Sequence, residues 1–438
     1  MAQEQLFGGV GGGSDIEVEQ GLEGAARVKR ANRAQSVLDA VCLDDLIPAD
    51  HRARAFWGLL EKLDLSAFYA PIQAREGEAG RPALDPRVLC CLWLYATSEG
   101  IGSARHLARL CERDAPYRWI CGGMHVGAHT LSDFRVGNEE ALDTLLSELL
   151  AALMRRGVVR LARVAQDGVR VRANAGAASF RRERSLRKCL KAAKEQVRLT
   201  RKQLDAPARD ESRVQTAAKA RAAQKLEQRV TEALAELDEV RGSKTRSNKK
   251  APEEVRASTT DPEARVMRMP DGGYRPGYNA QIATDTESRI VVGVSVTQIG
   301  SDMNQLAPML DELERRTGRL PDEHLVDGGY VKKETIERAS ERGVSIYAPQ
   351  SKLREGSSEP RWDDGEGVAA WRRRMESPEG REIYKERGST AETVNADLRQ
   401  WRGLRQLPVR GASKALSILL WMVLSYDLMR VIRFGIEI

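Results

Sequence analysis

The spacing of apolar residues divides the chain into a helical first part and a second part that begins with strands. From Arg27 to about Gly157, apolar residues recur at intervals of three and four, as in residues 84–100 and 140–157. This period is typical of amphipathic helices. Pro86 and Gly100 stand where one such helix would begin and end. We therefore expect an all-helical domain over residues 26–157, preceded by a glycine-rich, aperiodic and flexible N-terminus over residues 1–25.

The apolar period changes to two at residue 158, where a run of alternating apolar and polar positions begins. Residues 277–285 and 289–298 repeat the alternation, and a predicted helix that ends at Gly318 follows them. A short strand before Asp327, another helix, and a last strand over residues 344–350 complete the series. This order predicts an α/β fold: a mixed sheet with flanking helices, built from residues 158–182 and 255–438.

Residues 183–254 interrupt the series between the first and second strands. They are rich in Ala, Lys, Arg, Glu and Gln, contain no aromatic residue, and are broken near Pro207. This composition predicts a helical-hairpin or coiled-coil insertion of two long helices. Residues 241–250 are basic, and we expect them to form an exposed loop. The insertion is either a solvated hairpin or an arm for dimerisation or DNA contact.

The charge balance favours a polyanionic partner. The 438 residues carry a formal net charge of +7, with a pI of about 9.1. An excess of Lys and Arg attracts phosphate backbones, because each neutralised phosphate releases counterions. The six cysteines include no CxxC pair, which indicates reduced thiols in the cytoplasm rather than disulfides or a zinc site.

Two segments bear on targeting to a membrane. The N-terminus lacks the basic and apolar regions of a signal peptide. The most apolar stretch begins at Ala415, is short and is interrupted by Asp427, which predicts a buried core helix rather than a membrane span.

Three acidic residues are candidates for metal-dependent phosphoryl chemistry, which needs hard oxygen ligands at strand ends and on a nearby helix. Asp167 lies in the first strand, and Asp327 ends a later strand before two glycines. Glu392 would lie in the first turn of a helix that begins near Ala391 and is capped by Ser389 or Thr390. Taken singly, each aspartate also fits a structural turn.

Other acidic residues have structural interpretations. We expect Asp285 to close a hairpin and Asp302 to cap the helix that follows it.

With these residues in view, the chain resembles DDE-type insertion-sequence transposases of the IS5/IS1182-like family over residues 30 to 435. The resemblance lies in "RVAQDGVRVRANAG" (163–176), in "DGGY" (327–330), and in "YKERGSTAETVNADLRQWRGLRQLPVRG" (384–411). The third block follows the family pattern through Tyr384, Arg387, Glu392 and Arg399. The interval from Arg387 to Glu392 is one residue longer than the commonest pattern, and Arg replaces Lys at the end. Glu386 is the only close competitor for Glu392.

The resemblance implies an RNase H-like catalytic core after an all-helical DNA-binding domain. Asp167, Asp327 and Glu392 would be the catalytic residues and would hold two Mg²⁺ ions, with Mn²⁺ as a substitute. The DNA-binding residues that it implies near the scissile phosphate are Tyr384, Arg387, Arg399, Arg402 and Arg410. The expected partners are double-stranded DNA, as terminal inverted repeats and as target, and a second copy of the chain in at least a dimer on DNA.

The resemblance implies a transposase that binds element ends, cleaves the DNA and joins the 3′-OH ends to target DNA. A domesticated or inactive DNA-binding protein of the same fold is an alternative, and a nuclease is another. The expected location is the cytoplasm, in association with the nucleoid, with no membrane partner.

Overall fold

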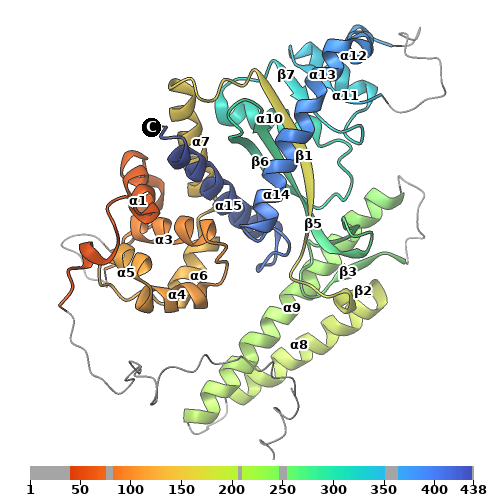
Figure 1. The fold of residues 1–438 in the computed structure, drawn as a ribbon. Coiled ribbons are helices and arrows are strands. Elements are labelled where there is room, and N and C mark those ends of the chain that lie inside the picture. Colours follow the sequence, from red (N-terminus) through yellow and green to blue (C-terminus); the bar gives the residue numbers. More distant parts are fainter. Residues whose placement is uncertain (1–39, 75–81, 206–209, 246–253, 351–363, 437–438) are drawn as a thin grey trace, which may run out of the picture. The chain divides into compact units, whose positions relative to one another are not determined.

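A mixed sheet forms the centre of the second part of the chain. The computed structural model describes residues 40–74, 82–205, 210–245, 254–350 and 364–436. The strands of the sheet are β1 (Arg163–Arg172), β4 (Arg265–Arg268), β5 (Tyr274–Asp285), β6 (Val291–Thr297), β7 (Glu323–Leu325) and β8 (Ser345–Tyr347). The path β4-β5-β1-β7-β8 runs through this six-stranded sheet, and β6 also pairs with β5 (Figure 1).

The register of the sheet places its long strands at the centre. β1 pairs antiparallel with β5, from Val164 opposite Asp285 to Arg172 opposite Gly277. On its other edge β1 pairs parallel with β7, and β7 pairs parallel with β8. β6 pairs with the same part of β5 as β1 does and therefore lies on the opposite edge of β5. This mixed sheet with flanking helices confirms the predicted α/β, RNase H-like fold class.

Helices make up the regular structure of the described residues before β1. They are α1 (Arg52–Lys62), α2 (Ser66–Tyr69), α3 (Pro86–Ser98), α4 (Ala104–Arg113), α5 (Ala115–Cys121), α6 (Ala128–Gly137) and α7 (Glu139–Arg155), after a short 3₁₀ turn, η1 (Leu43–Leu46). α3 begins at Pro86, as predicted, because proline suits the first helical position and the Asp85 carboxylate accepts the Arg87 N–H. The domain boundaries predicted at 26 and 157 stay predictions.

The C-terminal helix α15 (Ala412–Arg433) connects the helical part to the sheet, because it packs against α3, α6, α7 and β6. It is long and apolar enough to cross a membrane, but 78% of its most apolar window is buried inside the protein. Trp421 donates its indole N–H to the Arg135 carbonyl in the helical part. α15 is therefore a core helix, as its sequence predicted.

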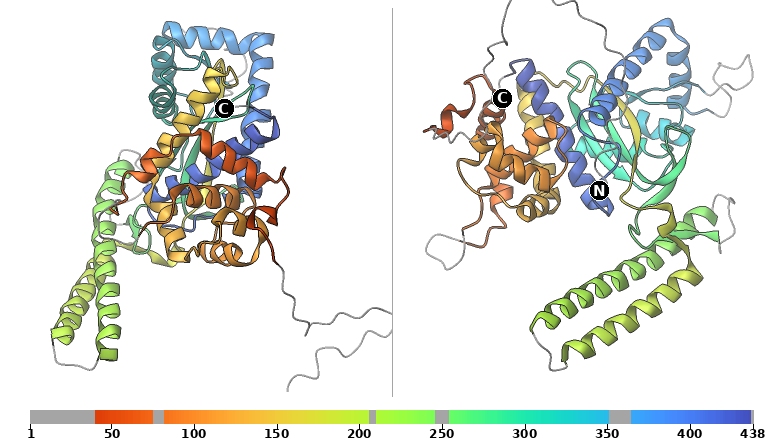
Figure 2. Two further views of the ribbon diagram at one scale, coloured as in Figure 1. Left: turned by 90° about the vertical axis from the view of Figure 1, so that its left-hand side faces the viewer. Right: turned by 60° about the horizontal axis from the view of Figure 1, so that its bottom comes forward.

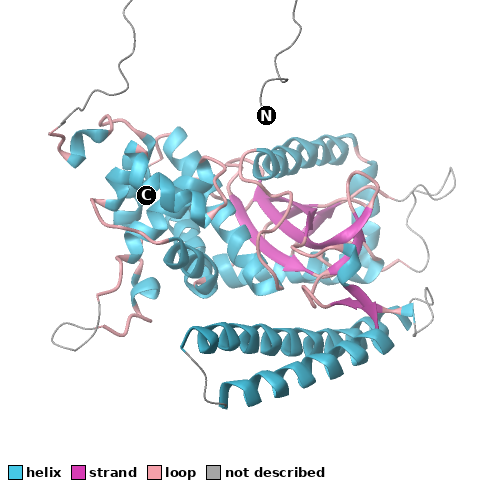
Figure 3. Cartoon of the chain, turned by 90° about the horizontal axis from the view of Figure 1, so that it is seen from below, coloured by secondary structure: helices cyan, strands magenta, loops and turns pink. Residues whose placement is uncertain are grey.

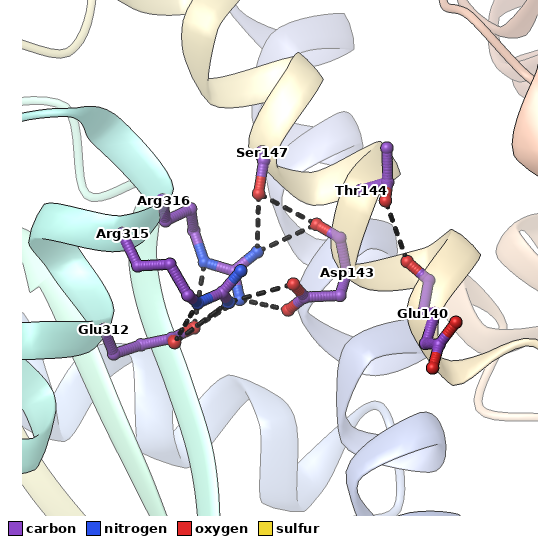
Figure 4. A network of polar contacts seen from close by, with 7 residues as sticks. All are labelled: Glu140, Asp143, Thr144, Ser147, Glu312, Arg315 and Arg316. Atoms are coloured by element: carbon purple, nitrogen blue, oxygen red, sulfur yellow. Dashed lines mark hydrogen bonds and ion pairs between the residues drawn. The ribbon is translucent and has the colours of Figure 1, made fainter.

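A polar network also joins the helical part to the sheet, between α7 and α10 (Leu306–Thr317) (Figure 4). The fully buried Arg316 guanidinium pairs with Asp143 of α7 and with Glu312 of its own helix. It also donates to the Asp143 carbonyl at 3.0 Å and to Ser147 Oγ at 3.1 Å. A buried guanidinium is costly unless its donors are paired. This network therefore holds α7 and α10 together at a fixed position.

The insertion forms the predicted helical hairpin. α8 (Glu183–Asp205) and α9 (Asp210–Thr245) lie side by side (Figure 2). Leu186 and Val230 belong to a small hydrophobic cluster between them. The hairpin starts and ends at a two-stranded sheet of β2 (Phe180–Arg182) and β3 (Arg256–Ser258), which the sequence did not predict (Figure 3).

One part of the hairpin prediction is wrong. Residues 241–245, which we expected in a loop, continue α9, because nothing before Thr245 breaks its helical hydrogen bonding. The rest of that segment lies outside the described residues.

Of the remaining helices, α11 (Lys333–Glu341) lies between β7 and β8 in sequence, and the others follow β8. The others are α12 (Glu366–Glu376), α13 (Pro378–Arg387), a π-helical turn η4 (Gly388–Glu392), and α14 (Thr393–Gln400). α13, η4 and α14 follow one another without a break, and η4 packs against both β1 and β5. The third predicted block therefore lies on a helix beside the central strands.

Candidate active site

Asp167 lies in the middle of β1, with its carboxylate held by two side chains from the helix opposite. Arg387 of α13 donates to Asp167 Oδ1 at 2.9 Å, and Asn395 of α14 donates to Asp167 Oδ2 at 2.9 Å. Val169 and Val171, which share this face of β1, are buried. The strand thus presents one acid on an otherwise apolar face, and both oxygens of that acid accept hydrogen bonds.

The electrostatic surroundings of Asp167 combine burial with neighbouring charges. Burial raises the pKa of the Asp167 carboxyl, and the Arg387 guanidinium and the Gly168 N–H lower it in part. The carboxylates of Asp302 and Asp327 raise this pKa further. A cation placed among these groups would relieve both the burial and the repulsion. The Arg387 guanidinium supplies one such cation in the structure.

Asp327 lies two residues beyond the end of β7. The parallel pairing of β1 and β7 ends with Ala165 opposite Leu325, so Asp167 and Asp327 each follow the last paired residue by two positions. The Asp327 carboxylate is close enough to raise the pKa of the Asp167 carboxyl. Asp327 is exposed, and its Oδ1 accepts the Gly328 N–H at 2.6 Å. The sheet thus brings together two acids that are 160 residues apart in the sequence.

Glu392 does not lie in the first turn of a helix that begins near Ala391, contrary to the sequence prediction. Ser389 and Thr390 are not caps, because α13 continues through η4 into α14 and leaves no helix terminus there. A π turn accommodates one extra residue within an α-helix. The turn from Gly388 to Glu392 therefore takes up the one-residue excess between Arg387 and Glu392 and brings both residues toward the same side of the helix.

Beyond Glu392, the helix residue that contacts Asp167 is Asn395, one turn further along. Glu392 itself is exposed and has no ion pair or hydrogen bond to another side chain among the described residues. Its Oε1 lies near Gly388, 3.7 Å from the position that a Cβ would take there. Glu386, its competitor, is paired with Arg163 at 2.6 Å.

The three predicted acids do not converge into one cluster. In the parts of the chain that the structure describes, no group of three acidic, His or Cys side chains is close enough to hold a metal ion. The chemistry of the donors nevertheless fits Mg²⁺, which prefers carboxylate oxygens. The pKa of the Asp167 carboxyl is raised mainly by burial, with smaller contributions from Asp302 and Asp327.

The five predicted DNA-binding residues lie in different environments. Tyr384 is half-buried near Arg387, and burial raises the pKa of its hydroxyl. Arg399 is partly exposed and has no ion pair within the described residues. Arg410 is exposed, and its Nε lies 3.4 Å from the Asn174 carbonyl.

Arg402 differs from the other four, because it is only 8% exposed. Its guanidinium pairs with Asp397 and lies over the Tyr426 ring, and burial lowers its pKa to about 10. These contacts commit the Arg402 side chain to the interior.

A polar network on the opposite face of β1 was not predicted from the sequence. The Asp302 carboxylate, expected as a helix cap, instead accepts from Arg170, Asn279 and Gln281 at 2.7–2.9 Å. The cap position of α10 is Gln305. A signal for this network was present in the sequence, since residues 279 and 281 are polar positions at a spacing of two within an apolar strand.

Gly168 makes this arrangement possible. A Cβ at residue 168 would lie 2.2 Å from Asp302 Oδ1. The glycine after Asp167 therefore makes room for a second carboxylate behind the strand.

Three further residues join the network. Gln281 Oε1 accepts the Tyr330 hydroxyl at 2.7 Å and Gln166 Nε2 at 2.9 Å, and His324 Nε2 lies 3.0 Å from Gln166 Oε1.

Two family models match the sequence. One, described as a transposase DDE domain, matches residues 244–428, and the other, described as a transposase domain (DUF772), matches residues 41–136. The first match contains Asp327 and Glu392, whereas β1 with Asp167 and most of the hairpin fall between the two matches. No curated protein and no solved structure matches the chain.

Proposed function

Because the chain belongs to the DDE transposases, with a pair of domains typical of the IS5/IS4 type, we propose that it cuts DNA at the ends of a mobile element and joins the freed ends to target DNA. The observation that carries this proposal is the parallel pairing of β1 with β7, beyond which Asp167 and Asp327 each follow by two residues, together with the helix of Glu392 that packs against β1.

We propose that Asp167, Asp327 and Glu392 hold the divalent ions. Asp167 lies on β1, which pairs with β7 on one edge and packs against the helix that contains Glu392. Two Mg²⁺ ions, which Mn²⁺ can replace, would supply Lewis-acid activation of the attacking oxygen and stabilisation of the leaving oxygen. Asn395 keeps Asp167 Oδ2 in place from the helix. Glu392 is favoured over Glu386 because it has no ion pair in the part of the chain that the structure describes, whereas Glu386 neutralises Arg163.

The arginines and tyrosine of the third block would hold the phosphodiester. Arg387 pairs with Asp167 at 2.9 Å, so the same guanidinium is placed to bind a phosphate that enters beside this carboxylate. Tyr384 lies next to it, and Arg399 follows Asn395 by one helical turn on the same face. Arg410 would contact the backbone further away, while the buried Arg402 supports the fold.

The reaction would proceed in two displacements at phosphorus. In the first, water attacks the phosphate at the element end, and the departing 3′ oxygen takes up a proton as a free 3′-OH. In the second, this hydroxyl attacks a phosphate of target DNA, forms the new bond and displaces a target 3′ oxygen. No covalent bond between protein and DNA is needed.

The test uses linear DNA that carries the terminal sequences flanking the gene, with Mg²⁺ and a supercoiled target plasmid. The wild-type protein should release 3′-OH ends and join them to the plasmid. Asp167→Asn, Asp327→Asn and Glu392→Gln should retain DNA binding and lose cleavage, and the matched variant Glu386→Gln should retain both.

The other outcomes of this test separate the alternatives. Cleavage without joining would indicate a nuclease, and binding without cleavage would indicate a DNA-binding protein. Loss of activity in Glu386→Gln with full activity in Glu392→Gln would overturn the assignment of the third acid.

We also propose that the protein acts in the cytoplasm, in association with the nucleoid, and as at least a dimer on DNA. Excision brings two element ends together, and a dimer would provide one catalytic centre for each. The mass of the complex with end-bearing DNA, measured by light scattering, tests this; a single copy on two ends would contradict it.

A further inference from the structure

The outer surface of α8 carries a concentrated basic face, defined as its eight Lys and Arg side chains from Arg184 to Lys202. All eight are exposed. At 100° per residue they fall within an arc of about 140° around the helix axis. Among the other exposed positions of α8, Glu195 falls inside this arc, whereas Gln196 and Gln203 lie outside it. The positive charge is therefore gathered on one side of the helix.

Few acidic residues neutralise this face. α8 contains three acidic residues. Glu183 pairs with Arg187, and Glu195 pairs with Arg198. Lys191, Lys194 and Arg201 have no acidic partner within the described residues.

The second helix of the hairpin does not share this charge. α9 contains seven basic and seven acidic residues, and several of its charges pair with one another or with neighbouring elements, as Arg241 does with Glu183. α8 instead uses its remaining side for packing, since Leu186, Ala193 and Val197 are buried. Packing against α9 therefore does not explain the basic face, which points away from the buried side.

The length of the basic face is comparable to one turn of a DNA duplex. From Arg184 to Lys202 the helix rises about 27 Å, at about 1.5 Å per residue. One turn of B-form DNA spans about 34 Å. Lys and Arg on an exposed helix face provide contacts to phosphates but no specific reading of bases.

We propose that the basic face of α8 binds the phosphate backbone of duplex DNA, outside the active site and independently of base sequence. The proposal rests on the proposed function only for the identity of the polyanion. It gives the hairpin a role that neither family match covers, because those matches end at residue 136 and begin at residue 244.

The test compares two triple variants of the full chain that remove the same charge. One carries Lys191→Gln, Lys194→Gln and Arg201→Gln on α8. The matched control carries Lys219→Gln, Arg221→Gln and Lys225→Gln on the exposed surface of α9. Circular dichroism checks that both fold.

The measurement is the Kd for a 30-base-pair duplex of arbitrary sequence, between 50 and 200 mM salt. Each phosphate contact contributes about 0.9 to the slope of log K against log salt. Between 50 and 200 mM salt, the affinity of the wild type should therefore fall about 40-fold more than that of the α8 variant, which lacks three contacts. The control should keep the wild-type slope.

Equal slopes for the two variants would overturn the proposal. A change in the oligomeric mass of the α8 variant without any change in slope would also overturn it, because this would show that the basic face contacts protein. Cleavage of end-bearing DNA by the wild type, measured in parallel, keeps the two proposals separate. If the wild type cleaves and the slopes are equal, only the hairpin proposal fails. If the wild type does not cleave, but the slope of log K against log salt is reduced in the α8 variant alone, only the proposed catalytic function fails.

Discussion

Replacing Asn395 with alanine removes one of the two side chains that hold the Asp167 carboxylate. The Asn395 amide donates to Asp167 Oδ2 at 2.9 Å, while Arg387 holds Oδ1. Asn395 is 9% exposed and the Asp167 side chain 25%, so water replaces the lost donor poorly. The variant should keep its fold. Its Asp167 carboxyl should be positioned less firmly and should ionise less readily.

The expected size follows from the charge on the acceptor. A hydrogen bond to an ionised group contributes about 1.5–3 kcal/mol. If the full amount is lost in the transition state, the cleavage rate falls about 10- to 150-fold. Burial already raises the pKa of Asp167, and loss of a donor that favours the carboxylate raises this pKa further. The acid limb of the pH–rate profile should therefore move to higher pH.

The assay is cleavage of end-bearing DNA under single-turnover conditions across a pH series. Gln400→Ala, an exposed amide on the same helix, is the matched control and should behave as wild type. Alkaline pH should partly restore the rate of Asn395→Ala. A folded Asn395→Ala protein with the wild-type rate and the wild-type pH profile would refute the reasoning.

Three further substitutions test the fold around the site. Arg316→Met should lower the free energy of unfolding by about 1–3 kcal/mol in denaturant titrations, because Asp143 and Glu312 lose the buried guanidinium between them and keep only the half-exposed Arg315; an unchanged free energy of unfolding would contradict this. Gly168→Ala should cost about 1–3 kcal/mol and reduce cleavage, since the new methyl group would overlap Asp302 and displace β1; unchanged stability would count against the close approach. Burial raises the pKa of Asp427 well above 3.8, so the folded state binds this proton more tightly than the unfolded state does. The stability that this protonated carboxyl contributes is complete below pH 3.8 and declines as the pH rises. The Tm of the wild type should therefore fall relative to that of Asp427→Asn from about pH 4 upward. Parallel curves of Tm against pH for the two proteins would exclude this linkage.

The sequence was sufficient to predict the elements that depend on local pattern. Period-two runs gave β1, β5 and β6, and the apolar run before Asp327 marked a short strand, β7, which ends at Leu325 two residues before the acid. The apolar stretch around Trp421 was recognised as a core helix rather than a membrane span. These predictions succeeded because alternation and helical spacing are set by neighbouring residues and by the need to bury one face.

The tertiary structure alone decided how the site is assembled. The π turn before Glu392 needs no particular residue type, so no local signal separated one continuous helix from a capped start at Ser389. Asn395 and Asp302 became neighbours of β1 only through contacts across 228 and 132 residues, respectively. The sequence by itself therefore determined which strands and acids exist, whereas the partners of Asp167 depended on how a distant helix and a loop pack on the two faces of one strand.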